Sequence, residues 1–235
     1  LFNMMSNRRR YGKVQNAMDT WRDYMVSMGF GYKLGIDLVG EKRGLIPNAT
    51  FYDKAYKGSW NGLTIISISI GQGEVNLTPL QIANLGATIA NRGYYYVPHV
   101  VRKVQGEPLD TVFTRRHYTK ASHKAYDYVV AGMRASVLRG TCRAANNPDY
   151  EVCGKTGTAQ NRGQDHSVFM GFAPMENPKI AIAVYVENGG FGAHYGVPIG
   201  SLMMEQYIKG KLSEVSEARA RDFQNRHIVY GKTNR

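Results

Sequence analysis

The sequence predicts an α/β domain in which an antiparallel sheet is covered by helices on both faces. Between residues 151 and 186, three apolar segments follow one another with only short turns between them. Such short connections require antiparallel pairing. The last segment, residues 180–186, alternates isoleucine and valine with alanine and tyrosine, so it has no polar face. A strand of this kind is typical of a sheet covered on both sides, and helical patterns before and after the strands complete the layers.

Two amphipathic helices are predicted from apolar residues that recur with the helical period. Residues 13–28 place such residues on one face and are followed by glycine. Residues 123–139 follow Ser122, a favoured N-cap, and are followed by Gly140. The inward face of this second helix is expected to consist of Ala125, Val129, Met133 and Val137.

A third helix is predicted after the sheet, over residues 197–212. Its apolar stripe is expected to consist of Ile199, Leu202, Met203 and Tyr207. The small alanines of the last strand would let this helix pack closely against the sheet. The remaining residues, 213–235, carry many alternating charges and are expected to form an exposed helix or to be disordered.

The clearest helix start lies at Thr78. Thr78 is a favoured N-cap, Pro79 occupies the first helical position, and Gln81 stands three residues after the cap. Together they form a capping box with the preferred proline. After this helix, residues 94–104 and 110–118 resemble two further strands.

Charge and cysteine content exclude some classes of function. The net charge is +12 and the isoelectric point is near 9.7, but the basic residues are scattered and no DNA or RNA recognition motif accompanies them. A solvated basic surface is therefore favoured, and no nucleic-acid partner is expected. Cys142 and Cys153 are too few for a zinc site, so neither a metal nor a cofactor is expected. A disulfide and two buried free thiols are both compatible with the sequence.

The segment EVCGKTGTAQN, residues 151–161, combines features that a strand rarely has. Gly157 leaves the strand bare, so that an extended ligand can lie against it. Lys155 adds a positive charge, and Thr156 and Thr158 add hydroxyls. An exposed strand edge binds a peptide as an added strand, and an outward N–H stabilises an oxyanion. These features suit a short peptide that ends in a free carboxylate.

Several motifs, in register over residues 15–210, resemble the transpeptidase domain of penicillin-binding proteins. They are WRDYMVSMGFGYKLGIDL, GLIPN, IGQGEVNLTPLQIANLGATIANRGYYYVPHVV, and GKTGTAQ followed by DHSVFMGFAPMENPKIAIAVYVENGG. The Lys-Thr-Gly element is shared by these proteins and serine β-lactamases. VENGGFGAHYGVPIG is most similar to penicillin-binding protein 2, the elongation-class enzyme. Residues 1–212 are thus identified as the C-terminal part of such a domain, and residues 213–235 as a charged tail.

The resemblance implies a β-lactamase/transpeptidase-like fold, incomplete at its N-terminus, and D,D-transpeptidase activity. In this family a serine attacks the penultimate D-Ala carbonyl of a stem peptide, and an amine of a neighbouring strand then takes the acyl group. Lys155 would orient the serine of a second motif and attract the substrate carboxylate. Thr156 and Thr158, on either side of Gly157, would hold that carboxylate. The Thr158 N–H would be one oxyanion donor.

The resemblance also implies partners and a location. The partners would be a stem peptide ending in D-Ala-D-Ala, β-lactam antibiotics that mimic it, and a membrane glycosyltransferase of the elongation machinery. The location would be the periplasmic face of the bacterial inner membrane, with the anchor in a missing N-terminal segment.

The sequence departs from the family pattern in two respects. No serine is followed by lysine three residues later, so the nucleophile motif is not present in this chain. Ser59-Trp60-Asn61 matches the family's Ser-x-Asn motif, but that motif normally precedes the WRDYM helix, so this match is interpreted as accidental. Both motifs are therefore expected upstream of this chain. Ser167 and Val168 stand where an alanine and an aromatic residue are common after the histidine.

Two other functions stay open. A serine β-lactamase or β-lactam sensor shares Lys-Thr-Gly but not the GQGEVNLTPLQ region in this form. A non-catalytic scaffold would dock peptidoglycan or partner proteins through the basic surface. Asp165 and His166 are interpreted either as a cleft-lining pair or as a turn cap with a satisfied histidine, and His194 as a loop residue.

Overall fold

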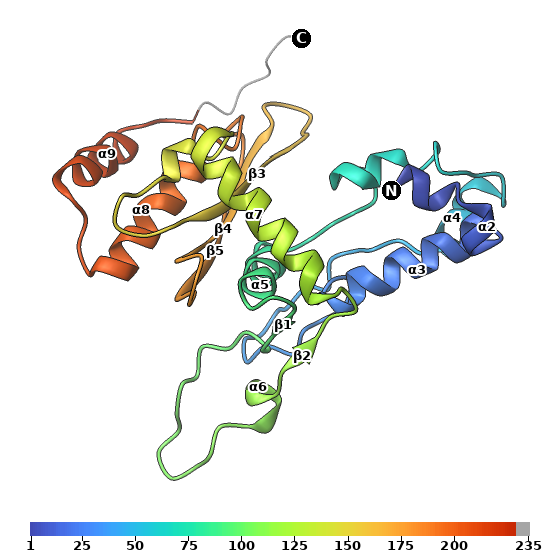
Figure 1. The fold of residues 1–235 in the computed structure, drawn as a ribbon, viewed down its shortest axis with the longest axis horizontal. Helices are drawn as coiled ribbons and strands as arrows, with labels where there is room; N and C mark the ends of the chain where they lie inside the picture. Colours follow the sequence, from blue (N-terminus) through green and yellow to red (C-terminus); the bar gives the residue numbers. More distant parts are fainter. Residues whose placement is uncertain (229–235) are drawn as a thin grey trace. The chain divides into compact units, whose positions relative to one another are not determined.

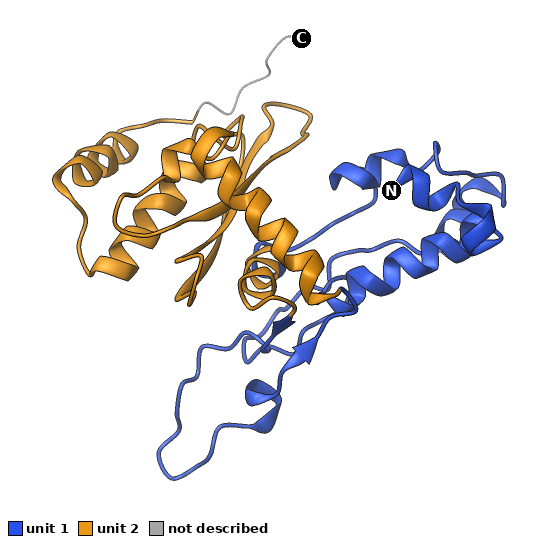
Figure 2. Cartoon of the chain, in the orientation of Figure 1, with its two compact units in different colours: residues 1–81, 94–121 blue, residues 82–93, 122–235 orange. Residues whose placement is uncertain are grey.

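The computed structural model describes residues 1–228, and residues 229–235 lie outside the described part. The chain divides into two compact units, residues 1–81 with 94–121 and residues 82–93 with 122 onward (Figure 2). The predicted tail, residues 213–235, therefore falls partly outside the described residues. Within it, α9 (Glu214–Gln224) is a helix with no buried residue, which agrees with the exposed helix expected there.

The first unit is mainly helical and packs around its own apolar core (Figure 1). Its elements are α1 (Phe2–Met5), α2 (Arg8–Tyr11), α3 (Val14–Ser27), α4 (Ala49–Tyr56), the 3-10 helix η1 (Ile66–Ile70), β1 (Tyr94–Tyr95), α6 (Thr111–Thr114) and β2 (His117–Tyr118). The helix predicted over residues 13–28 is α3. Its Ala17 and Met18 are fully buried, as the apolar face requires.

The two strands predicted for residues 94–104 and 110–118 are mostly wrong. Only β1 and β2 pair, over two residues each. Residues 111–114 form α6 instead, because the Asp110 side chain accepts a hydrogen bond from Val112 N–H and caps a helical turn. Asp110 is the first residue of the second predicted strand, but aspartate is among the best N-cap residues and here begins a helix.

The capping box predicted at the start of α5 (Pro79–Ala90) is confirmed. Thr78 N–H donates to Gln81 Oε1 at 3.1 Å, and Gln81 N–H donates to Thr78 Oγ1 at 3.2 Å. Gln81 is also 2% exposed, and its Nε2 donates to three carbonyl oxygens in preceding loops. These belong to Gly29, Tyr32 and Arg43. A residue predicted as a local cap thus also organises loops far away in sequence.

The second unit contains the predicted sheet. Besides most of α5 it comprises α7 (His123–Arg139), the 3-10 helix η2 (Arg143–Ala145), β3 (Cys153–Ala159), β4 (His166–Ala173), β5 (Ile180–Val186), α8 (Gly196–Lys209) and α9 (Figure 1). The three strands pair antiparallel in the order β3-β4-β5, as the short turns predict.

One face of the sheet is organised around Phe169 of β4, whose side chain is fully buried. Four glycines leave room for its ring. A β-carbon on Gly154, Gly171 or Gly200 would lie 2.5–2.6 Å from ring carbons, and one on Gly196 would lie 3.0 Å from the phenylalanine β-carbon. Gly196 and Gly200 belong to α8, so this helix packs directly over the ring.

The other face of the sheet is approached by α5. A β-carbon on Gly86 would lie 3.3 Å from Met170 Cγ and 3.6 Å from Ala181 Cβ. Helices therefore cover both faces, as predicted. The prediction that the C-terminal helix packs on the alanine face is wrong, because α5 occupies that face and α8 lies against Phe169 and Val184.

The buried faces of two helices differ from the predicted ones. In α8, Met203 and Tyr207 are 53% and 63% exposed. In α7, Val129 is 44% exposed, and Ala125 is also exposed. In α7 the predicted Met133 and Val137 are buried, as expected, but Tyr126 and Val130 complete the inward face. In α8 the inward face is the one that places glycine beside Phe169. The buried residues are Gly196, Val197, Pro198, Gly200, Ser201, Met204 and Glu205 in α8, and Tyr126, Val130, Met133 and Val137 in α7. The caps predicted for α7 are confirmed: Ser122 accepts from Ala125 N–H, and Gly140 ends the helix.

Candidate functional site

The candidate site is the outer strand of the sheet, β3. Its inner side pairs with β4 over its whole length. Within residues 1–228, no other strand pairs with its outer side. Backbone N–H and C=O groups on this outer side are therefore not used in the sheet.

Lys155 and the two threonines differ in orientation because successive side chains of a strand point to opposite faces. Thr156 lies opposite Phe169 and Thr158 opposite Ser167, so both threonines share the face that α8 covers. Lys155 starts from the other face, is exposed, and its ammonium donates a hydrogen bond to the Thr156 carbonyl oxygen. The cation therefore reaches the backbone of Thr156, while the two partly buried hydroxyls project from the opposite face of the same strand.

The hydroxyl of Thr156 has a defined partner in the protein. Its Oγ1 lies 2.8 Å from Thr141 Oγ1, which belongs to the segment between α7 and β3. Such a hydrogen bond fixes the rotamer of a side chain that would otherwise turn freely. Thr141 was not singled out in the sequence, because nothing in its local pattern indicates contact with a strand 15 residues later.

The two glycines of the site strand have different environments. A β-carbon on Gly154 would lie 2.6 Å from a ring carbon of Phe169, so internal packing demands glycine there. A β-carbon on Gly157 would lie 3.3 Å from Val168 Cβ and would meet no other residue. Packing therefore requires Gly157 less strictly than Gly154.

A loop between β5 and α8 lies against the same strand. A β-carbon on Gly192 would lie 2.4 Å from Val168 O, 2.8 Å from Gly157 O and 3.0 Å from Thr156 Cβ. These distances leave no room for a side chain, so the backbone at residue 192 is in direct contact with the middle of β3 and β4.

Asp165 and His166 have the geometry of a turn cap. Asp165 Oδ1 accepts from Asn161 N–H at 3.4 Å, within the β3–β4 turn. His166 Nδ1 accepts from Asn188 N–H at 3.0 Å, and its ring packs on Tyr185 with 5.2 Å between centroids. These contacts favour the satisfied histidine over the cleft-lining pair. The side chain of His194 is exposed and packs edge-on against Phe191.

The two cysteines are buried free thiols, which resolves the alternative left open by the sequence. Burial raises the pKa of both, that of Cys153 to about 12. Cys142 Sγ lies beneath the site strand, 3.6 Å from where a Gly154 β-carbon would be. Protonated, buried thiols act here as small apolar groups of the core.

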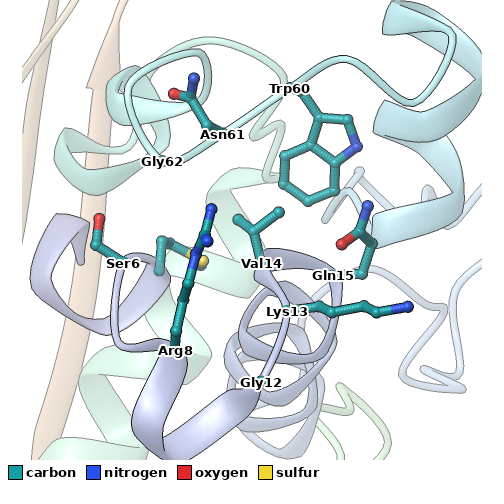
Figure 3. Close-up of a pocket in the computed structure, with 10 residues that line it drawn as sticks. Ser6, Arg8, Gly12, Lys13, Val14, Gln15, Trp60, Asn61 and Gly62 are labelled. Carbon is teal, nitrogen blue, oxygen red and sulfur yellow. The ribbon is translucent and has the colours of Figure 1, made fainter.

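The Ser-x-Asn match is part of a separate pocket in the first unit, with a volume of about 530 Å³ (Figure 3). Trp60 is buried, and its indole N–H donates to Asp53 at 2.7 Å. Asn61 Oδ1 accepts from Leu63 N–H at 2.8 Å, so the asparagine caps its own turn. Figure 3 shows Arg8 and Lys13 on the opposite wall of this pocket from Asn61. Trp60 and Asn61 of this match thus have local structural partners.

In the part of the chain that the structure describes, no helix has the length and hydropathy needed to cross a membrane.

Comparison with known proteins identifies the family and agrees with the predicted fold. The family model for the penicillin-binding protein transpeptidase domain matches residues 5–205. The peptidoglycan D,D-transpeptidase MrdA of Acinetobacter baumannii is 38% identical over 198 residues, which are 76% of this chain and 29% of that protein. The chain thus spans less than a third of the length of this relative.

Two solved structures have the same fold. Penicillin-binding protein 2 of Pseudomonas aeruginosa, in complex with WCK 5153, is 34% identical with a TM-score of 0.73. This match covers 84% of this chain and 44% of that one. A structure on the coordination of polymerization and crosslinking by a peptidoglycan synthase complex is 30% identical, with a TM-score of 0.69, and covers 85% and 34% of the two chains. With the family model matching most of its length, the chain belongs to the penicillin-binding protein transpeptidase domain family.

Proposed function

We propose that this chain is the C-terminal part of a peptidoglycan D,D-transpeptidase of the penicillin-binding protein 2 type. Residues 1–212 form part of the catalytic domain and residues 213–235 a charged tail. The observation that carries the proposal is the outer strand β3, with its exposed Lys155 beside two hydroxyls and an unpaired side. The MrdA relative, which carries the activity in its name, supports it.

The substrate is a stem peptide that ends in D-Ala-D-Ala, bound along the unpaired side of β3. Its terminal carboxylate is held by the hydroxyls of Thr156 and Thr158 and attracted by the ammonium of Lys155. Gly157, between the threonines, keeps the strand surface bare for the extended peptide. Thr156 is already oriented by Thr141, which lowers the entropy lost on binding.

The reaction proceeds in two acyl transfers. A serine outside this chain attacks the penultimate D-Ala carbonyl, the tetrahedral oxyanion accepts a hydrogen bond from Thr158 N–H, and the peptide bond breaks to release D-Ala. An amine of a neighbouring stem peptide then attacks the acyl-serine, forms the cross-link and frees the serine. Lys155 orients the serine of the Ser-x-Asn motif, also outside this chain. β-Lactams enter the first step and stay bound as the acyl-enzyme.

The proposed partner and cellular location follow from the proposed activity. The partner is a membrane glycosyltransferase that supplies the glycan strands, in line with the synthase complex among the solved structures. The location is the periplasmic face of the inner membrane, with the anchor in a segment that precedes this chain.

The test uses the full-length protein and a fluorescent penicillin. Lys155→Ala is expected to lower the acylation rate by about 10²-fold, the size typical of losing one oriented stabilising group. Lys179→Ala removes an exposed lysine next to β5 and serves as the matched control. Labelling of Lys155→Ala at the wild-type rate would remove this residue from the mechanism.

A second measurement separates the alternatives. Residues 1–235 alone are expected to form no covalent adduct in mass spectrometry, because no serine in them has lysine three residues later. Fast turnover of penicillin by the full-length protein would favour a β-lactamase. A full-length sequence without Ser-x-x-Lys would favour the scaffold.

A further inference from the structure

Residues 187–196, which are the loop between β5 and α8 and the first residue of α8, are attached to β4 at their C-terminal half by a buried hydroxyl. Ser167 is fully buried. Its Oγ donates to Phe191 O at 2.9 Å and accepts from Gly196 N–H at 3.1 Å. The two partners lie on either side of Gly192, the residue whose backbone touches β3.

The first half of this loop is held by other groups. Gly190 N–H donates to Asp165 O at 2.8 Å, and Asn188 N–H donates to His166 Nδ1 at 3.0 Å. Both contacts are made by residues that precede Gly192, the loop residue that touches β3, and both lie toward the β3–β4 turn. The hydroxyl of Ser167 holds both ends of the stretch between residues 191 and 196, and Val197 N–H also donates to Gly192 O, within that stretch, at 2.9 Å.

That part of the loop shapes the face from which the two threonines project. Ser167 pairs directly with Thr158 across the sheet. A β-carbon on Gly192 would lie 3.0 Å from Thr156 Cβ and 2.8 Å from Gly157 O. The loop therefore lies directly beside Thr156 and the Gly157 carbonyl, and its position bears on the space around the two hydroxyls.

We infer that Ser167 is a positioning residue, which presses the 187–196 loop onto β3 and so sets the pocket for the substrate carboxylate. The inference rests on the proposed function and extends it to a residue outside the Lys-Thr-Gly motif. Because Ser167 acts on the carboxylate pocket through the loop, it is expected to affect binding before acylation more than the acylation step itself.

The test measures acylation of the full-length protein by a fluorescent penicillin over a range of concentrations, which separates the dissociation constant of the first complex from the limiting rate. Ser167→Ala leaves the buried Gly196 N–H without its partner. It is expected to raise the dissociation constant about tenfold and to leave the limiting rate within about twofold. Hydrogen exchange over residues 187–196 is expected to increase, while exchange over α7 is unchanged.

Ser201→Ala is the matched control, because it removes another buried serine hydroxyl from the same unit. No hydrogen bond in the described part of the chain links Ser201 to the loop. It is expected to leave the dissociation constant and loop exchange at their wild-type values. Equal effects of the two variants would overturn the inference, since they would report only the loss of a buried hydroxyl.

Gly192→Ala provides an independent route, should Ser167→Ala fail to fold. It leaves the Ser167 side chain unchanged but forces the loop away from Val168 O and Gly157 O. It is expected to raise the dissociation constant at least tenfold. Wild-type binding by either folded variant would overturn the role of Ser167 while the proposed function stands. Failure of the wild-type protein to be labelled would overturn both.

Discussion

The close packing of glycines around Phe169 allows a quantitative prediction of the free energy of unfolding for substitutions at these positions. In the wild-type protein, Gly154→Ala places a methyl group 2.6 Å from Phe169 Cε2 and 3.0 Å from Cζ. Neither the strand backbone nor a fully buried ring moves freely, so this overpacking is expected to cost about 2 kcal/mol of unfolding free energy. Phe169→Leu removes three ring carbons and is expected to cost about 2 kcal/mol by itself.

The double mutant separates this mechanism from a general intolerance of the strand. Once Phe169 is leucine, both ring atoms that obstruct the added methyl are gone, and the nearest remaining atom is Cys142 Sγ at 3.6 Å. Gly154→Ala should then stabilise by about 0.5–1 kcal/mol, since alanine loses less backbone entropy than glycine. The coupling between the two sites is thus about 2.5–3 kcal/mol, at the upper end for residues in contact.

Urea denaturation of the four proteins, followed by circular dichroism, gives the four unfolding free energies. The same penalty for Gly154→Ala in both backgrounds would refute the reasoning. It would mean that the glycine is required for backbone conformation and not for the ring of Phe169.

Two further predictions concern buried polar side chains. Gln81→Leu is expected to destabilise the protein by about 2–4 kcal/mol in urea denaturation, because it leaves several backbone groups unpaired; a loss near 1 kcal/mol would reduce Gln81 to a simple cap. The pKa of Glu205 is lowered: burial raises it, but hydrogen bonds from Ser216 and Ser213 and the charge of Lys209 outweigh burial. Its stabilising contribution is therefore present above the ordinary value of 4.5 and lost as the pH falls through the folded-state pKa. Hydrogen exchange in α9 should rise over this acidic range in the wild type but not in Glu205→Gln, and identical profiles would contradict the assignment.

The sheet and the site strand were predictable because their signals are local. Three apolar segments with short turns allow only antiparallel neighbours, and Lys155 with its glycine and threonines departs from an ordinary strand within a few residues. Thr78 and Gln81 likewise fulfil a capping pattern that is complete in four residues.

The helical faces were less predictable because a partner decides them. Met203 and Tyr207 are apolar enough to be buried, yet the face of α8 that packs inward is the one that offers Gly196 and Gly200 to Phe169. The small size of these glycines predicts a buried face only when the position of the Phe169 ring, on another element, is known. The same holds for the inward tyrosine of α7.

The sequence did not reveal Ser167, for which we infer a positioning role. The sequence marks it only as a departure from the alanine common at that position. Its partners, Phe191 O and Gly196 N, are backbone groups 24 and 29 residues away. Every residue type has a backbone N–H or C=O group, so the sequence does not indicate which of these groups will bond to Ser167.

Besides its proposed role in peptide binding, the unpaired side of β3 brings a risk of self-association. Two copies of such a border could dock onto each other strand to strand, the first step toward aggregation. A charged lysine in the middle of the border disfavours this, because two like charges would face each other across the new ladder. Lys155 would thus act as a gatekeeper of solubility, and its replacement by a neutral residue is expected to make the protein self-associate more readily at high concentration.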